Sequence, residues 1–181
     1  MKLLEINEAK KEAKEILEAT KSKMGAIPNL YKMMANNPSL LIAYTQADDT
    51  FRNNSGFTSQ EQEVILLSVA IYNNCHYCVA AHSFIAKNQS HVSSDVLEAL
   101  RNQEKLPDDK LNALSTFAKS VAKERGYPTD EATKALKDKG YGDEHIAGVV
   151  TGVGMKTMSN YINHIGKTPV DDMFSEFKWE K

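Results

Sequence analysis

The chain has 181 residues, of which 41% are hydrophobic and 25% are charged, a composition typical of a globular protein with one apolar core. We therefore expect a single domain over residues 1–181. The 22 basic and 24 acidic side chains leave a net charge of -2. This balance favours neither nucleic acid nor an anionic membrane as a partner.

The sequence also bears on the cell compartment. Acidic residues and lysines interrupt residues 1–17, where a signal peptide would need an apolar run, and no stretch approaches the roughly 20 apolar residues of a membrane span. Two cysteines are too few for the disulfide framework of a small secreted fold. We expect a cytoplasmic protein, in which a close cysteine pair is usually redox-active or metal-binding.

Helix signals follow one another from the N-terminus. Strong helix formers over about 8–22 predict a first helix, with Asn7 as its cap. Pro28 and Pro38 each suit the first turn of a following helix. The segment 58–61 (TSQE) has the spacing of a capping box and precedes the apolar run VILLSVAIY, which indicates a buried helix.

The second half of the chain repeats these signals. Caps and charge patterns predict helices after Ser93 or Ser94, over about 107–126, after Thr129 and over about 143–166. No segment alternates with period two over the length of a strand. The sequence therefore predicts an all-α fold of roughly eight or nine helices with short connections.

An internal similarity links two of these segments. Residues 56–78 align with residues 140–162 at a constant offset, sharing a Gly-aromatic pair, an acidic helix start and a long apolar stretch. Two similar helical halves would explain the match as a pseudo-repeat, and two amphipathic helices that resemble each other by chance would explain it equally well.

Both cysteines lie in the segment NNCHYCVAAHS, residues 73–83. Asparagine is a poor helix-interior residue and a good cap, so we expect one helix to end near Tyr72 and another to begin at Cys75, with Asn74 as its cap. If the chain reverses direction there, the two helices run antiparallel and Glu63 falls close to His82. In one unbroken helix, Glu63 and Cys75 would instead lie about 18 Å apart.

The second of these helices would place Cys75, Cys78 and His82 on one face, at positions i, i+3 and i+7. Free N–H groups in a first helical turn favour a thiolate. Glu63 would orient the imidazole of His82, which would take the proton of Cys78. The Cys78 thiolate would then attack an electrophilic oxygen and become a sulfenic acid, which Cys75 would resolve as a disulfide.

The four residues together carry a family resemblance. The pattern consists of Glu63, eleven intervening residues, the Cys75–Cys78 pair, three further residues and His82. It is similar to the signature of the AhpD-like proteins in the carboxymuconolactone decarboxylase superfamily. Residues 25–44 and 160–174 also resemble the terminal segments of the peroxidase-related branch.

This resemblance implies an all-helical fold with an internal pseudo-repeat, assembled as a homo-oligomer. It implies alkylhydroperoxidase activity without a metal or organic cofactor, with a hydroperoxide as substrate and a protein thiol as reductant. AhpD proper has a histidine directly before the second cysteine, where this chain has Tyr77, and His76 lies one position earlier. Tyr77 would either donate a hydrogen bond or pack.

Three alternatives use the same residues differently. The dithiol would serve a general thiol–disulfide oxidoreductase or a redox sensor. A zinc site would use Cys75, Cys78 and His82, with His76 or His91 as a further ligand. The spacing of these residues along a helix is unfavourable for binding one metal ion. Glu63 and His82 would otherwise act as an acid/base pair on a carbon acid or lactone, with incidental thiols.

Two further segments have alternative interpretations. Methionines and Tyr31 near the N-terminal prolines would line an apolar pocket or pack in the core. The C-terminal MFSEFKWE, residues 173–180, would dock on a partner or pack on its own domain.

Overall fold

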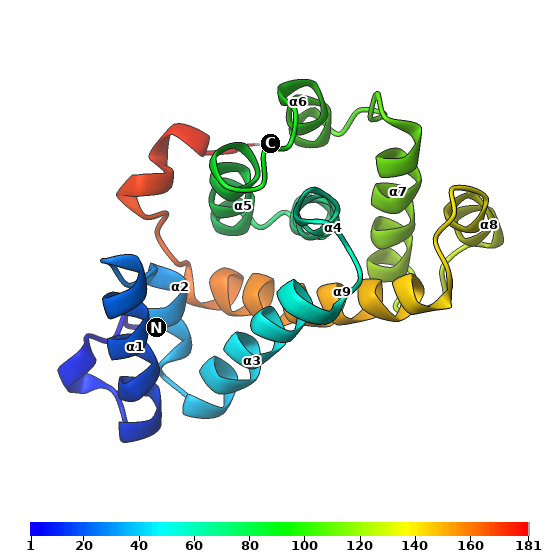
Figure 1. Ribbon diagram of the computed structural model, residues 1–181. Coiled ribbons are helices and arrows are strands. Elements are labelled where there is room, and N and C mark those ends of the chain that lie inside the picture. Colours follow the sequence, from blue (N-terminus) through cyan, green and yellow to red (C-terminus); the bar gives the residue numbers. More distant parts are fainter. Residues whose placement is uncertain (181) are drawn as a thin grey trace.

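A computed structural model describes residues 1–180, and these residues form helices connected by short loops, with no strand among them (Figure 1). This confirms the predicted all-α fold. The α-helices are α1 (Lys11–Met24), α2 (Asn29–Met34), α3 (Pro38–Asn54), α4 (Ser59–Tyr72), α5 (His76–Asn88), α6 (Ser94–Asn102), α7 (Asp109–Lys123), α8 (Asp130–Asp138) and α9 (Asp143–Gly166). Two 3-10 helices, η1 (Ile6–Glu8) and η2 (Asp172–Phe177), lie near the ends.

Helix α4 is the centre of the domain. It is seen end-on in Figure 1, surrounded by α5, α6, α7 and α9, and it packs against all four. Every residue from Glu61 to Ile71 is buried. A helix that is apolar on all sides must be covered on all sides, so the run VILLSVAIY explains this central place. The buried Glu61 and Glu63 at its start are polar exceptions within that core.

Helix α9 passes close to α3 and α4 because two of its glycines leave room for them. A Cβ atom at Gly152 would lie 3.0 Å from Ile65 Cγ2 and 3.2 Å from Phe51 Cε2. At Gly148 it would lie 2.9 Å from a ring carbon of Phe57. All three distances are shorter than an ordinary contact, so a side chain at either position would overpack the helix contacts.

Several helix boundaries follow the predicted caps. Thr58 accepts a hydrogen bond from the Glu61 N–H in a capping box, Thr129 caps α8, and Pro38 opens α3. The prediction for the first helix was wrong at its start, because Asn7 lies inside the 3-10 turn η1 and α1 begins after Lys10. Helix-forming composition does not separate a 3-10 turn from the α-helix that follows it.

The two aligned segments share a helix start but not a helix end. Residues 56–78 form a loop, α4 and the turn into α5, whereas the matching part of α9 continues without a break to Gly166. Only the first segment therefore contains a reversal of the chain. That the two halves of the domain are related by a pseudo-repeat stays a prediction.

The C-terminal segment packs on its own domain. Phe174 and Phe177 are buried, and their rings contact Phe84 on α5. Trp179 is also buried, and its indole N–H donates to the Arg101 carbonyl at 2.9 Å. Over residues 1–180, no helix is both long enough and apolar enough to cross a bilayer.

Candidate functional site

The site begins with the reversal of the chain between α4 and α5. Asn73 ends α4, and Asn74 has a left-handed backbone with φ of 55°, which turns the chain. The prediction that Asn74 caps α5 was wrong, because Cys75 is the N-cap and α5 begins at His76. The Asn73 amide also donates to Asn160 on α9 at 2.8 Å, which fixes the turn against that helix.

The reversal brings Glu63 and His82 together. His82 Nδ1 lies 2.9 Å from Glu63 Oε2, the side chain of Glu63 is fully buried and that of His82 is 7% exposed. A carboxylate facing Nδ1 holds the proton on that nitrogen. The lone pair of Nε2 is therefore the one left to accept a proton. The antiparallel arrangement inferred from the sequence is present.

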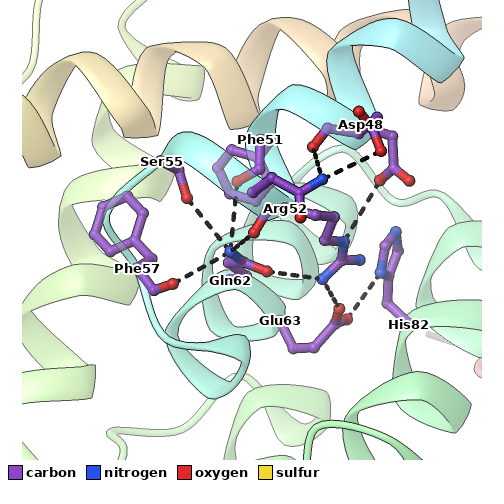
Figure 2. A network of polar contacts seen from close by, with 10 residues as sticks. Asp48, Phe51, Arg52, Ser55, Phe57, Gln62, Glu63 and His82 are labelled. Atoms are coloured by element: carbon purple, nitrogen blue, oxygen red, sulfur yellow. Dashed lines mark hydrogen bonds and ion pairs between the residues drawn. The ribbon is translucent and has the colours of Figure 1, made fainter.

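Arg52 completes this network, although no pattern in the sequence pointed to it. Its Nη1 lies 2.5 Å from Glu63 Oε1, so the two carboxylate oxygens are held by different partners, as Figure 2 shows. Its Nε lies 3.5 Å from Asp48. Gln62 donates to the Arg52 carbonyl at 3.0 Å and the Phe57 carbonyl at 3.2 Å, which holds the end of α3 against α4.

The electrostatics of the network favour an ionised acid beside a neutral base. Burial would raise the pKa of Glu63, but the charges and hydrogen bonds of His82 and Arg52 outweigh it and lower that pKa. Burial, with the charges of Lys156 and Arg52, lowers the pKa of His82 below 6.5, against the opposing effect of Glu63. His82 is therefore a neutral proton acceptor at neutral pH.

The two thiols lie against α9. Asn163 Nδ2 is 3.3 Å from Cys78 Sγ and 3.9 Å from Cys75 Sγ, and Cys78 Sγ is 3.9 Å from Ser159 Oγ. Burial would raise the pKa of Cys78, but interactions with Cys75, Lys156 and His82 lower it well below its usual value. The interaction with Cys78, together with burial, raises the pKa of Cys75. Cys78 is thus the thiol that ionises.

Cys78 and His82 line one cavity of about 170 Å³. Among the described residues, no direct hydrogen bond joins their side chains. Its lining is mainly apolar and aromatic. It consists of Met24, Pro28, Leu30, Tyr31, Tyr44, Asp48, Arg52, Tyr77, Cys78, Ala81, His82, Ile85, Lys156 and Phe174. The alternative in which Met24 and Tyr31 contribute to a pocket is the one observed, whereas Met33 and Met34 are buried in the core.

Lys156 is the second residue that the sequence analysis missed. It lies on α9 at 0% exposure, and its Nζ has no hydrogen-bond partner among the described residues. Lys156, Ser159 and Asn163 are at i, i+3 and i+7, so one face of α9 presents all three to the thiols. A buried ammonium is costly unless a negative charge lies nearby, and the Cys78 thiolate is such a charge.

Tyr77 and His76 both form hydrogen bonds with the C-terminal segment. The Tyr77 hydroxyl donates to Asp171 at 2.6 Å and accepts from the Leu30 N–H at 3.2 Å, which ties α5 to α2 and the C-terminal segment. His76 is exposed, and its Nδ1 lies 2.6 Å from the Trp179 carbonyl.

The geometry also bears on the zinc alternative. Within residues 1–180, no three His, Cys, Asp or Glu side chains converge in a way that could hold a metal ion. His76 is turned toward Trp179, and the backbone carbonyl of His91 accepts from Gln60. The four side chains proposed as zinc ligands are therefore not assembled.

Comparisons with known proteins agree with this architecture. Residues 38–106, which include all four motif residues, match the model of the carboxymuconolactone decarboxylase family. A search of curated proteins finds no match. The AhpD core structure of an uncharacterized peroxidase-related protein from Ralstonia eutropha JMP134 superposes with a TM-score of 0.85 at 22% identity, over 96% of this chain and 93% of that chain.

Two further structures have the same fold. A peroxidase-related protein from Silicibacter sp. TM1040 has a TM-score of 0.77 at 22% identity, over 97% of this chain and 93% of that one. The debrominase Bmp8 has a TM-score of 0.75 at 16% identity, over 92% and 90%. The family match thus spans residues 38–106, which contain the motif, and the solved structures share the fold of this chain.

Proposed function

We propose that this protein is a thiol-dependent peroxidase that reduces organic hydroperoxides through Cys75 and Cys78. The observation that carries the proposal is the buried Glu63–His82 pair, which lines the same cavity as a thiol of lowered pKa. A carboxylate-oriented neutral imidazole beside a thiol is the arrangement that activates a sulfur nucleophile.

The reaction consumes both thiols. The Cys78 proton moves to Nε2 of His82, and the thiolate attacks the terminal oxygen of the hydroperoxide. The O–O bond breaks, the alkoxide takes the proton from Nε2 and leaves as an alcohol, and Cys78 becomes a sulfenic acid. The Cys75 thiol attacks the Cys78 sulfur, and water leaves as the disulfide forms.

The charges around Cys78 support the first step. The Asn163 amide, 3.3 Å from the sulfur, donates to the thiolate, and the Lys156 ammonium compensates its charge. Glu63 and Arg52 neutralise each other nearby. His82, which is neutral before the reaction, accepts the Cys78 proton.

The cavity supports a small organic substrate. Its volume is about 170 Å³, and Tyr31, Tyr44 and Phe174 contribute aromatic surface to it. We propose a small apolar hydroperoxide as the substrate, with a thiol reductant that restores the dithiol. A homo-oligomer in the cytoplasm that uses no bound cofactor remains part of the proposal, on the strength of the sequence resemblance.

A single-turnover experiment tests this function. Reduced protein is mixed with cumene hydroperoxide, and the loss of free thiols and the mass of the product are followed. We expect two thiols to be lost per hydroperoxide, much faster than for a free thiol, and His82→Ala to slow the loss about a hundredfold. Loss at the rate of a free thiol in both proteins would contradict the peroxidase function.

Two further arms separate the remaining alternatives. Tribromopyrrole is the ligand in a structure of the debrominase Bmp8, so the same experiment with that compound asks whether bromide is released in place of peroxide reduction. Turnover of a lactone by a Cys75→Ser, Cys78→Ser variant would favour acid/base chemistry by Glu63 and His82.

A further inference from the structure

The two cysteines line different cavities. Cys78 lines the substrate cavity described above, whereas Cys75 lines a second cavity of about 300 Å³ at the start of α5. The second cavity is lined by Cys75, His76, Tyr77, Asn163, His164, Lys167 and Thr168. Within the described residues, Tyr77 alone lines both. The two sulfur-bearing residues therefore border different cavities.

The second cavity also has unused hydrogen-bonding groups. Thr168 is 9% exposed and Asn163 is 4% exposed, and neither Thr168 Oγ1 nor Asn163 Oδ1 has a hydrogen-bond partner among residues 1–180. Buried polar atoms without partners are uncommon in folded proteins and point to a missing ligand or water. Here two of them lie in the wall of the cavity that contains Cys75.

We propose that this second cavity is the site where a negatively charged thiol reductant binds and attacks Cys75 in the oxidised protein. The inference rests on the dithiol cycle of the proposed function. The proposal assigns the two half-reactions to different cavities, with the hydroperoxide at Cys78 and the reductant at Cys75. The reductant can then approach before the product of peroxide reduction has left.

The charge of the lining identifies the class of reductant. Lys167 is exposed at the cavity, His76 and His164 are also exposed there, and the lining includes no acidic residue. A thiol with a carboxylate or sulfonate beside it matches this lining, with the Thr168 hydroxyl as a donor to the anion.

The exchange step follows from the unequal stabilisation of the two sulfurs. A reductant thiolate forms a bond to Cys75 Sγ, the Cys75–Cys78 bond breaks, and Cys78 leaves as a thiolate beside Asn163 and Lys156. The sulfur with the lower pKa is the better leaving group. A second reductant thiol then attacks the reductant sulfur of the mixed disulfide, releasing Cys75. Two thiols thus supply the two electrons.

The experiment uses protein oxidised with diamide, so that it does not depend on any peroxidase activity. The re-reduction rate is measured with 2-mercaptoethanesulfonate and with cysteamine, an anionic and a cationic thiol, at equal thiolate concentrations. We expect the anionic thiol to be faster by about tenfold, and high salt to remove that preference. Quenching with acid and mapping the adduct by mass spectrometry should place the mixed disulfide on Cys75.

Two tryptophan variants separate the openings. His164→Trp narrows the second cavity and should slow re-reduction by about tenfold while peroxide-driven oxidation changes little. Ile85→Trp narrows the substrate cavity and should do the reverse. A mixed disulfide on Cys78, or equal effects of both variants on re-reduction, would overturn the inference. Slow oxidation by hydroperoxide with normal, Cys75-directed re-reduction would contradict only the proposed function.

Discussion

Glu63 Oε2 lies 2.9 Å from Nδ1 of His82, although the two residues are 19 positions apart in the chain. The contact exists because Asn74 adopts a left-handed backbone and reverses the helix direction. Its chemical result is a defined tautomer of His82, with the proton on Nδ1 and the lone pair on Nε2. Proton transfer in the proposed reaction depends on that tautomer.

The Glu63→Gln variant tests this dependence through pH. Protonation of His82 removes the proton acceptor, so the rate of peroxide-driven thiol loss should fall as the pH drops through a pKa below 6.5. Glu63 raises that pKa, so Glu63→Gln should move the acid limb to lower pH and reduce the plateau rate by about tenfold or more. Stopped-flow rates from pH 4 to 9 measure both effects. The exposed Glu98→Gln serves as the control, and an unmoved acid limb in Glu63→Gln would refute the assignment.

Arg52 is predicted to matter mainly for stability. Arg52→Met leaves the fully buried Glu63 with His82 as its remaining partner, and breaking such a pair costs roughly 3–5 kcal/mol of unfolding free energy. Urea denaturation at pH 7 measures this cost. The double variant Arg52→Met, Glu63→Gln should lose less than the sum of the two single variants. Asp48→Asn, which removes the more exposed partner of Arg52, should cost about 1 kcal/mol or less.

The proximity of Glu63 and His82 could be predicted because it depends only on how many residues separate each of them from the turn. Once Asn73 and Asn74 are taken as the reversal, antiparallel helices place positions at equal distances from the turn side by side. The identity of the cap was the part that failed. Asparagine is favoured both as an N-cap and in a left-handed turn, and composition alone does not separate the two roles.

Arg52 and Lys156 could not be placed in the same way. Arg52 reaches Glu63 from α3, and Gln62 on α4 donates to two carbonyls near the end of α3 and to the Phe57 carbonyl in the following loop. Lys156 did leave a signal in the sequence, since it is the sole charged residue in the segment 146–158. A lone charge in an apolar helix is either exposed or functional, and only the packing of α9 decided between them.

Lys156→Met tests the electrostatic role of that lysine. Loss of the ammonium should raise the pKa of Cys78, because the lysine charge is one of the interactions that lower it. The thiolate absorbance at 240 nm, followed against pH in the reduced protein, measures this shift. Lys119→Met, at a partly buried lysine on α7 that lines neither cysteine cavity, is the matched control.

The same variant should change the stability of the two redox states by different amounts. Disulfide formation removes the thiolate and leaves the buried ammonium uncompensated, at a cost in free energy. We therefore expect Lys156→Met to raise the melting temperature of the oxidised protein more than that of the reduced protein. An equal change in both states would show that Lys156 does not interact with the Cys78 charge.

The closeness of α9 to the site can be tested at two of its glycines. Gly152→Ala places a Cβ atom 3.0 Å from Ile65 and 3.2 Å from Phe51, and such overpacking costs about 1–3 kcal/mol. Gly154→Ala has no atom within 4 Å of the new Cβ, so it should stabilise the helix by about 0.5–1 kcal/mol. The two substitutions are chemically identical and two residues apart in α9. Opposite changes in the melting temperature would therefore follow from packing alone. Because Phe51 adjoins Arg52, Gly152→Ala should also slow thiol oxidation, whereas Gly154→Ala should leave it unchanged.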